Sequence, residues 1–543
     1  MDSFGLWGII PPLLTIVLAF VTKDVIVSLF LGILSATLIV VGGNPGIALV
    51  KLTDLLAGSL ADGWNIRIFL FCALLGGLVG MLTKTGAAVS FGRWASSKLK
   101  SSKGSQMLAF IFGIVIFIDD YFNSLTVGTI MRPVFDKTKT SRAKLAYILD
   151  STAAPVCILA PISSWVVTVM SIVRQAPGFM DDKGNYLLGI NEFQFFIKAI
   201  PFNLYAITTL IMVLAIIIFN RDFGPMKQSE MLAATGQLYN EKKYGPVSGN
   251  VPEAEVSRAK PFDMLFPIIV LIITAVAFFP ITTWIGAIDG EKITTFTAAI
   301  QSMSIGDAFN NTDSSKALMY AIIITIVISY IYYLARGLMN LSESGEALRD
   351  GIKSMVPALI ILTMAWSIGT IIKSPKSQGG LGLGYFLSES VAGGKFPIGL
   401  LPGIMFVLSA LISFATGTSW GTFGIMIPIA MPIITGLAQA KGYTLPAEVN
   451  ATMITIAGVL SGAVFGDHAS PISDTTILSS TGAGVPHLEH VATQMPYAVF
   501  VAICSLVGFI VGGLCMNLAI CWIATLVSLA LGLVFLPKLY RTR

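Results

Sequence analysis

Long apolar runs are the feature of this sequence that most constrains its fold. Several of them approach the roughly 20 apolar residues that a membrane-spanning helix needs. Examples are Ile9–Val21, Val25–Val41, Ala317–Leu334 and Leu518–Leu536. Only 12% of the 543 residues are charged, whereas a soluble domain carries roughly 25%. We therefore expect an all-α polytopic membrane protein embedded in the lipid bilayer.

Basic residues predict the orientation of the helices, because short cytoplasmic loops are enriched in Lys and Arg. The segment 221–262 is rich in both and has the composition of a flexible linker, so we place it in the cytoplasm. The connection 282–315 is predominantly acidic and belongs outside. Counting crossings from the linker gives about 11 transmembrane helices, with the N-terminus outside and the C-terminus in the cytoplasm.

One apolar segment, near 105–135, does not fit a crossing helix. Basic residues flank it at 84–104 and at 132–144, so both of its ends face the cytoplasm. The segment is interrupted at 119–124 by Asp-Asp-Tyr-Phe-Asn-Ser, which leaves arms too short for a hydrocarbon core about 30 Å thick. We therefore predict a re-entrant hairpin that enters the membrane, turns within it and leaves on the same side.

A second apolar segment, near 401–436, has the same design. Two short apolar arms surround the polar turn Thr416-Gly417-Thr418-Ser419-Trp420-Gly421. When 124–133 is aligned with 419–428, a Ser, an Ile, a Met and a Pro match in the same order. We interpret this segment as a second hairpin that is related to the first.

A helix interrupted by Pro and polar residues follows each predicted hairpin. The two broken helices lie near 145–173 and near 450–480, and Pro161-Ile162-Ser163 in the first matches Pro471-Ile472-Ser473 in the second. The crossing count gives the two units opposite orientations, the inverted-repeat design of secondary transporters. The expected divisions are N-terminal transmembrane helices at 1–59, inverted repeat 1 at 60–220, a cytoplasmic linker at 221–262, connecting transmembrane helices at 263–349, inverted repeat 2 at 350–515, and a C-terminal helix with a basic tail at 516–543.

The tip of the first hairpin contains side chains that suit a cation. Asp119 and Asp120 are adjacent, and Asn123 and Ser124 follow them. Neighbouring carboxylates in a low-dielectric turn repel each other unless a cation lies between them. Carboxylate, amide and hydroxyl oxygens are also the ligands that hard cations prefer. The alternative is a solvated turn between two short helices.

The second broken helix contains three ionisable residues within an apolar stretch. Asp467, His468 and Asp474 surround a break that Gly466 and Pro471 mark. Charges at bilayer depth are costly and tend to mark ion or proton pathways. The acids are therefore candidates for binding sodium and protons in alternation, and His468 is a candidate for carrying a proton near neutral pH. The alternative for Asp474 is a capping role at the second half-helix.

Asp150 is the acid at the corresponding break of the first repeat. It either takes part in transport or is neutralised by Arg132 or Lys144.

The segment His487-Leu488-Glu489-His490 has residue types that suit a metal, but we interpret it as a polar interhelical loop. The sequence has no Gly-x-x-x-x-Gly-Lys-Ser/Thr phosphate-binding loop and no recognisable nucleophilic triad. We therefore expect neither an ATP-driven pump nor an enzyme.

Two motifs together closely resemble the NhaC-type Na⁺/H⁺ antiporter family. They are Ile118-Asp119-Asp120-Tyr121-Phe122-Asn123-Ser124 and Gly466-Asp467-His468 followed by Ser470-Pro471-Ile472-Ser473-Asp474-Thr475-Thr476. The resemblance covers most of the chain and departs at Ala469, where Cys is frequent. It implies an ion-transporter-superfamily fold, in which hairpin-bearing elements move against a scaffold. It also implies exchange of sodium for protons across the inner or plasma membrane of a prokaryotic cell.

The leading hypothesis is a secondary transporter that exchanges Na⁺ for H⁺ by alternating access. We expect Asp119, Asn123, Asp467 and Asp474 to bind Na⁺ near the membrane midplane. The full set of candidate ion- and proton-binding residues is Asp119, Asp120, Asn123, Ser124, Asp150, Thr418, Ser419, Asp467, His468, Ser470, Ser473, Asp474 and Thr475. Apart from the transported ions, we expect no cofactor and no nucleic-acid partner, and a homodimer is left open.

The main alternative is a Na⁺- or H⁺-coupled transporter of an organic anion or an amino acid. The family that the chain resembles includes exchangers of malate and lactate and also amino-acid permeases. A substrate carboxylate would need a partner such as Arg132, Arg174 or His468. A channel is a third class, and paired breaks in inverted repeats argue against it.

Overall fold

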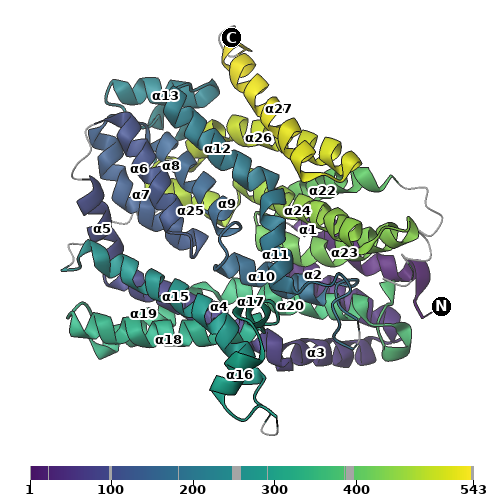
Figure 1. Cartoon of the computed structure of the whole chain (residues 1–543). Helices are drawn as coiled ribbons and strands as arrows, with labels where there is room; N and C mark the ends of the chain where they lie inside the picture. The colour runs from purple at the N-terminus through teal and green to yellow at the C-terminus, as the bar shows by residue number, and fades with distance from the viewer. Residues whose placement is uncertain are drawn as a thin grey trace.

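The structure of the chain, a computed structural model, consists of helices joined by short connections (Figure 1). It describes residues 2–22, 24–96, 101–181, 183–247, 258–289, 292–383, 386 and 397–539. These ranges contain no strand, and an isolated antiparallel bridge pairs Met180 with Tyr186. The predicted all-α architecture is confirmed.

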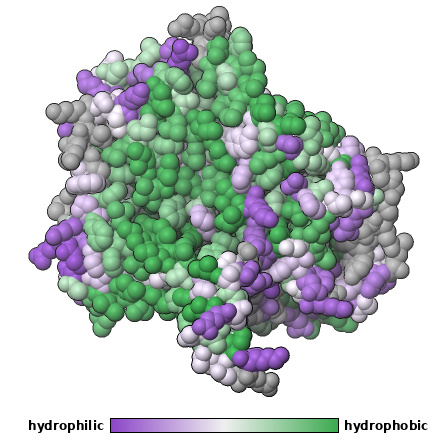
Figure 2. Space-filling view, in the orientation of Figure 1, coloured by the Kyte–Doolittle hydropathy of each residue, from purple (hydrophilic) through white to green (hydrophobic). Residues whose placement is uncertain are grey.

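Nine helices in the described ranges are long and apolar enough to cross a membrane. They are α4 (Gly63–Lys84), α15 (Pro261–Gly286), α18 (Ser314–Ala335), α20 (Val356–Lys373), α22 (Leu401–Thr416, preceded by η4, Ile398–Leu400), α23 (Ser419–Ala440), α24 (Leu445–Ala469), α26 (His487–Cys515) and α27 (Leu518–Leu539). A tenth candidate is formed by α11 and η2 (Glu192–Phe202) with α12 (Leu204–Phe219), which bend by 45°. Figure 2 shows the broad hydrophobic surface that such helices present, as a multi-pass membrane protein requires.

Shorter helices complete the described chain. They are η1 (Gly5–Ile9), α1 (Ile10–Thr22), α2 (Val25–Val40), α3 (Pro45–Ala61), α5 (Ala87–Ser96), α13 (Gly224–Ala234), α14 (Glu241–Tyr244), α16 (Phe296–Ser302), α17 (Ile305–Asn310), α19 (Leu341–Ser354) and η3 (Lys376–Gln378). The expected linker therefore contains α13 and α14. Its residues 248–257, residues 97–100 and the end of the basic tail at 540–543 lie outside the described residues.

Two helical pairs meet at the polar turns of the predicted hairpins. In the first pair, α6 (Ser102–Val115) and α7 (Asp120–Lys137) flank residues 116–119. In the second pair, α22 and α23 flank Gly417 and Thr418, and their 16 and 22 residues make longer arms than the sequence pattern indicates. Gly417 has φ +70°, and an added Cβ would lie 2.7 Å from the backbone oxygen of Ile472. Glycine therefore allows both the turn and its close approach to the next helix break.

An interrupted helix follows each hairpin. The first consists of α8 (Arg142–Thr152), α9 (Ala154–Cys157) and α10 (Ser164–Gln175). The second consists of α24 and α25 (Asp474–Ala483), with residues 470–473 between them. Because a proline lacks an N–H and clashes with a preceding carbonyl, Pro471 is compatible with the break and not with a continuous helix.

Packing of α25 against α7 and α8 joins the two halves of the chain. The α7–α25 approach is so close that a Cβ added at Gly128 would lie 2.6 Å from the backbone of Gly482. In Figure 1, α4, α15, α18 and α19 form a separate group of neighbouring helices. Most residues of the hairpin tips and helix breaks are buried, although Pro161, Ile472 and Asp474 are exposed, and apolar helices form much of the outer surface.

Candidate functional site

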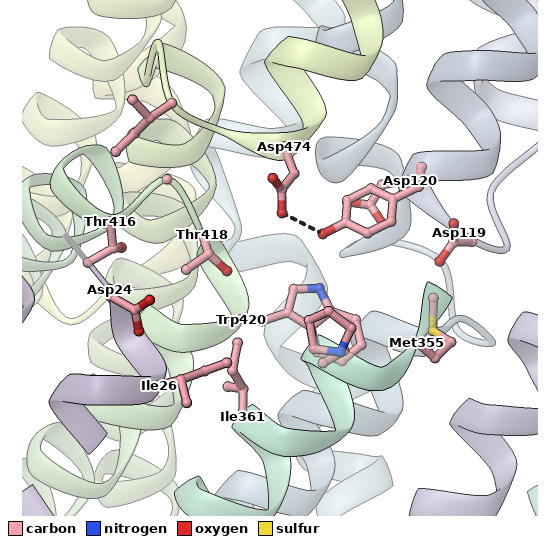
Figure 3. Close-up of a pocket in the computed structure, with 15 residues that line it drawn as sticks. Asp24, Ile26, Asp119, Asp120, Met355, Ile361, Thr416, Thr418, Trp420 and Asp474 are labelled. Carbon is pink, nitrogen blue, oxygen red and sulfur yellow. Dashed lines mark hydrogen bonds between the residues drawn. The ribbon is translucent and has the colours of Figure 1, made fainter. Parts of the chain in front are cut away.

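A cavity of about 210 Å³ lies where both hairpin tips meet the N-terminal ends of α2, α20 and α25. Four aspartates line it: Asp24, Asp119, Asp120 and Asp474 (Figure 3). The other lining residues are Ile26, Tyr121, Met355, Pro357, Ala358, Ile361, Thr416, Gly417, Thr418, Trp420 and Ile472. Among the described residues that line this cavity, none is Lys, Arg or His. Its lining is therefore strongly acidic, with an apolar and aromatic part.

The first hairpin places two of these acids at the start of α7. Asp119 is the N-cap, and its Oδ1 accepts a hydrogen bond from the backbone N–H of Phe122 at 3.0 Å. Asp120 is the first residue of the helix, and both side chains are only 3% exposed. The unpaired N–H groups at a helix N-terminus stabilise nearby negative charge. The local fold therefore holds both carboxylates at the cavity.

Asp474 reaches the cavity from the start of α25. It is the first residue of that helix, and its Oδ2 accepts a hydrogen bond from the hydroxyl of Tyr121 at 3.2 Å (Figure 3). The N-cap is Ser473, and no side chain caps the helix. The alternative interpretation of Asp474 as a helix cap is therefore wrong. Its carboxylate instead connects the second helix break to the first hairpin.

Asp24 was not among the predicted site residues. It is the N-cap of α2, and its Oδ1 accepts a hydrogen bond from the backbone N–H of Val27 at 2.8 Å. An aspartate directly before an apolar helical run is a recognisable capping pattern. That pattern predicts the helix start but cannot show that the cap faces a cavity formed by residues hundreds of positions away.

Hydroxyl groups from the second hairpin tip complete the polar lining. Thr418 is the N-cap of α23, and Thr416 ends α22. The hydroxyl of Thr416 donates to the backbone oxygen of Ile412 at 2.8 Å, which leaves its lone pairs available to accept. The tip therefore adds neutral oxygens to the aspartates.

Asp467 lies next to this lining but is not part of it. Its Oδ2 accepts hydrogen bonds from the backbone N–H and the hydroxyl of Ser419 at 3.2 and 2.8 Å. Its Oδ1 accepts one from the hydroxyl of Ser473 at 2.6 Å, and Ser473 and Thr475 share a further hydroxyl contact of 2.9 Å. The buried carboxylate thus connects the second hairpin tip to the break between α24 and α25. Ser470 supports the same turn by donating to the backbone oxygen of Phe414 at 2.8 Å.

Asn123 and Ser124 connect helices and do not line the cavity. The Asn123 amide nitrogen donates to the backbone oxygens of Gly113, Ile116 and Thr152 at 2.7, 3.0 and 3.0 Å. This fixes the first hairpin to the end of α8. The hydroxyl of Ser124 accepts a hydrogen bond from Ser479 of α25 at 3.2 Å.

Asp150 and His468 belong to a second buried polar cluster. The Oδ2 atom of Asp150 accepts hydrogen bonds from Thr476, His490 and Gln494. The ring of His468 contacts the hydroxyls of Ser151 and Tyr205 at 3.2 and 2.7 Å. Lys144 does not neutralise Asp150, because it forms a buried ion pair with Asp222.

The interpretation of His487-Leu488-Glu489-His490 as a polar interhelical loop is wrong. These residues form the first turn of α26, and Glu489 and His490 are fully buried. Glu489 accepts hydrogen bonds from the hydroxyl of Ser229 and the backbone N–H of Asn240, both at 2.7 Å. Sequence reasoning missed His490 and Gln494, although their spacing of four residues on one helix face was a usable signal.

The predicted Na⁺ ligands are divided between two locations. Asp119 and Asp474 line the cavity, whereas Asn123 and Asp467 hold the helix ends beside it. In the described part of the chain, no three His, Cys, Asp or Glu side chains come close enough to share a metal ion. Joint coordination of Na⁺ by these four residues stays a prediction. The arrangement favours an acidic cavity for a mobile cation over a preassembled metal centre.

Comparison with known proteins agrees with this architecture. A model of the Na⁺/H⁺ antiporter family matches residues 156–514. An uncharacterised protein of Haemophilus influenzae is 38% identical over 534 residues, covering 97% of this chain and 94% of that protein. The malate-2H⁺/Na⁺-lactate antiporter of Bacillus subtilis is 33% identical over 147 residues, covering 24% of this chain and 29% of the relative.

A solved structure shows a similar fold. It is that of MtrF from Neisseria gonorrhoeae, described as illuminating a class of antimetabolite efflux pumps. The TM-score is 0.51 at 14% identity, with 87% of this chain and 84% of that chain covered. The family match indicates a transporter of the secondary antiporter type. Since the family model spans well over half of the sequence, the chain belongs to the Na⁺/H⁺ antiporter family.

Proposed function

We propose that this protein exchanges Na⁺ for H⁺ across the cell membrane of a prokaryote by alternating access. The observation that carries the proposal is the cavity with four aspartates and no basic side chain among its described lining residues. Asp119 and Asp120 are buried side by side, whereas Asp24 and Asp474 are exposed. Two adjacent buried carboxylates cannot both stay ionised without compensation, so they take up either cations or protons. Competition between the two for the same carboxylates gives obligatory exchange. The N-terminus would lie outside and the C-terminus in the cytoplasm.

The positions of the aspartates support coupling between binding and movement. Asp119 and Asp120 start α7, Asp24 starts α2, and Asp474 starts α25. A cation in this cavity attracts the starts of three different helices, whereas protonation of the carboxylates removes that attraction. Since Asp474 also accepts a hydrogen bond from Tyr121, its charge state acts on the contact between the first hairpin and the second helix break.

The second candidate is coupled exchange of an organic anion, which a different cavity favours. A cavity of about 580 Å³ is lined by Lys51, Arg174 and Lys373, together with Asp54 and Asp62. These basic side chains, of which Arg174 also forms an ion pair with Glu192, suit a carboxylate better than the acidic cavity does. The Bacillus relative, by its name, exchanges malate and lactate. This candidate places the solute in the basic-lined cavity and keeps the coupling cation among the aspartates.

Purified protein in liposomes containing a pH-sensitive dye separates the two candidates. For Na⁺/H⁺ exchange, an inward Na⁺ gradient makes the lumen alkaline without any organic solute. If Asp474 binds the exchanged ions, Asp474→Asn reduces the initial rate by about tenfold or more, which corresponds to an increase of about 1.4 kcal/mol in the transport barrier. Asp350→Asn, at an exposed aspartate of α19, serves as the matched control and keeps the wild-type rate.

The solute arms of the experiment test the second candidate. Malate, lactate and an amino acid are added to one side in separate runs. Proton movement that occurs only with one of these solutes contradicts simple Na⁺/H⁺ exchange. In that case, Lys51→Gln should weaken the solute-dependent flux.

A further inference from the structure

The second buried cluster connects four helices around Asp150. Asp150 lies on α8, His468 on α24, Thr476 on α25, and His490 and Gln494 on α26. All five side chains are at most 1% exposed. Gln494 also donates to the backbone oxygen of His468 at the end of α24. The cluster therefore lies at the junction of both helix breaks, and none of its members lines the acidic cavity.

Three polar atoms of this cluster have no hydrogen-bond partner among the described residues. Asp150 Oδ2 accepts from Thr476 at 2.9 Å, from Gln494 at 2.7 Å and from His490 Nε2 at 3.2 Å. Asp150 Oδ1, His490 Nδ1 and Gln494 Oε1 are unpaired. Buried polar atoms without partners are rare in folded proteins. Three within one set of bonded side chains indicate that the cluster takes an additional ligand.

The chemistry of the unpaired atoms restricts that ligand. An ionised Asp150 carboxylate can only accept a hydrogen bond, so His490 Nε2 is assigned as the donor and Nδ1 as the nitrogen with a free lone pair. The other two unpaired atoms are acceptor oxygens. The cluster therefore lacks a hydrogen-bond donor and not an acceptor. A shared metal ion is disfavoured, since no described group of three His, Cys, Asp or Glu side chains meets that requirement.

Charged and titratable side chains from several helices surround His490. From α8 it faces Asp150, and from α24 it faces His468. Its own helix contributes His487 and Glu489, and Tyr205 of α12 contacts His468. Arg132 of α7 and Arg142 of α8 approach Gly484 at the end of α25, and the Lys144–Asp222 ion pair lies further along α8. Asp150 is therefore the acid in direct contact with the imidazole.

We infer that His490 and Asp150 form a proton-binding site that is separate from the acidic cavity. In this site, His490 Nδ1 takes up a proton, the ring becomes an imidazolium, and Asp150 stabilises its charge. The inference rests on the proposed function for its role in exchange. Helix α25 provides the coupling, because its first residue, Asp474, lines the cavity and its third, Thr476, donates to Asp150. A cation at Asp474 and a proton at His490 thus act on the same short helix.

The small number of histidines makes proton binding directly observable. The chain has three, His468, His487 and His490, so ¹⁵N-histidine NMR of the full-length protein in nanodiscs shows three rings. Loss of one signal in His490→Gln assigns that ring, and His487→Gln assigns the other residue on α26. Spectra recorded over a series of pH values test whether Nδ1 of His490 gains and loses a proton. Adding Na⁺ at constant pH should lower its protonated fraction.

Transport measurements on the same variants test whether this site takes part in Na⁺/H⁺ exchange. His490→Gln and Asp150→Asn should lose proton-coupled Na⁺ flux by about tenfold or more but keep ²²Na⁺/Na⁺ exchange, which moves no proton. His487→Gln, half-buried at the same helix end, should keep both activities. Retained ²²Na⁺/Na⁺ exchange shows that a variant is folded. If a variant does not fold, the pH titration of the wild-type rings decides the question.

Two results would overturn the inference. One is a His490 ring whose protonation does not change over the tested pH range. The other is a His490→Gln protein with the wild-type rate and pH profile of Na⁺/H⁺ exchange. Failure of the proposed function looks different: the wild-type protein then shows no Na⁺-driven proton movement, while the His490 ring still titrates.

Discussion

At the scale of single residues, the aspartates of the cavity combine a structural and a chemical role. Asp24 and Asp119 cap helices through backbone N–H groups, and Asp474 binds the Tyr121 hydroxyl. A capping carboxylate keeps an oxygen free for another ligand. The sequence predicts Asp119, Asp120 and Asp474 because acids within apolar segments are costly. It does not predict Asp24, whose cap pattern is common, or His490, whose partner Asp150 lies 340 positions away.

Replacing Asp24 tests whether this acid contributes to cation binding. Asp24→Asn keeps an N-cap side chain but removes one of the four charges in the cavity. We expect Na⁺ affinity to fall about three- to tenfold, the effect of losing roughly 1 kcal/mol of electrostatic attraction, with little change in stability. Equilibrium binding of ²²Na⁺ to the purified protein measures this affinity. Asp54→Asn, an acid of the other cavity, is the control, and an equal loss in both variants would speak against a specific role.

At the scale of elements, the interrupted helices are what bring distant residues to one place. Gly466 and Pro471 predict a break, and the structure has residues 470–473 between α24 and α25. The sequence pattern predicts helix length less well than it predicts the break, because hairpin arms and crossing helices have the same apolar composition. The 22 residues of α23 illustrate this. The packing partners of α25 also depend on tertiary contacts that no local pattern encodes.

The close approach of α7 and α25 is expected to be sensitive to side-chain size. In Gly128→Ala, the new Cβ would lie 2.6 Å from the backbone of Gly482, so the helices must separate. Overpacking of this kind costs about 1–3 kcal/mol, and we expect a lower Tm and slower exchange. Gly345→Ala on α19 is the matched control, because nothing lies within 4 Å of its added Cβ. A Gly128→Ala protein as stable and as active as that control would contradict the importance of this contact.

At the scale of the whole molecule, apolar helices surround two groups of acidic and polar side chains. The hydrophobic surface in Figure 2 and the nine candidate spans of the described chain fit a bilayer. Two polar centres lie between the helices: the acidic cavity, in which Asp24 and Asp474 are exposed, and the fully buried cluster around Asp150. Composition alone predicts the membrane class, and the motifs near 119 and 467 predict where the polar centres lie. Their separation into two centres becomes visible only when the helices are assembled.

The most direct test of the account is the pH dependence of Na⁺ binding to the purified protein without any organic solute. If Na⁺ and H⁺ compete for the same cavity, the apparent Kd for ²²Na⁺ rises as the pH falls. Displacement of one proton per Na⁺ gives an increase of about tenfold for each pH unit over which the competing carboxyl is protonated. Asp474→Asn should weaken binding and flatten this dependence. A Kd that does not change with pH, or binding that requires an organic solute, would contradict the account.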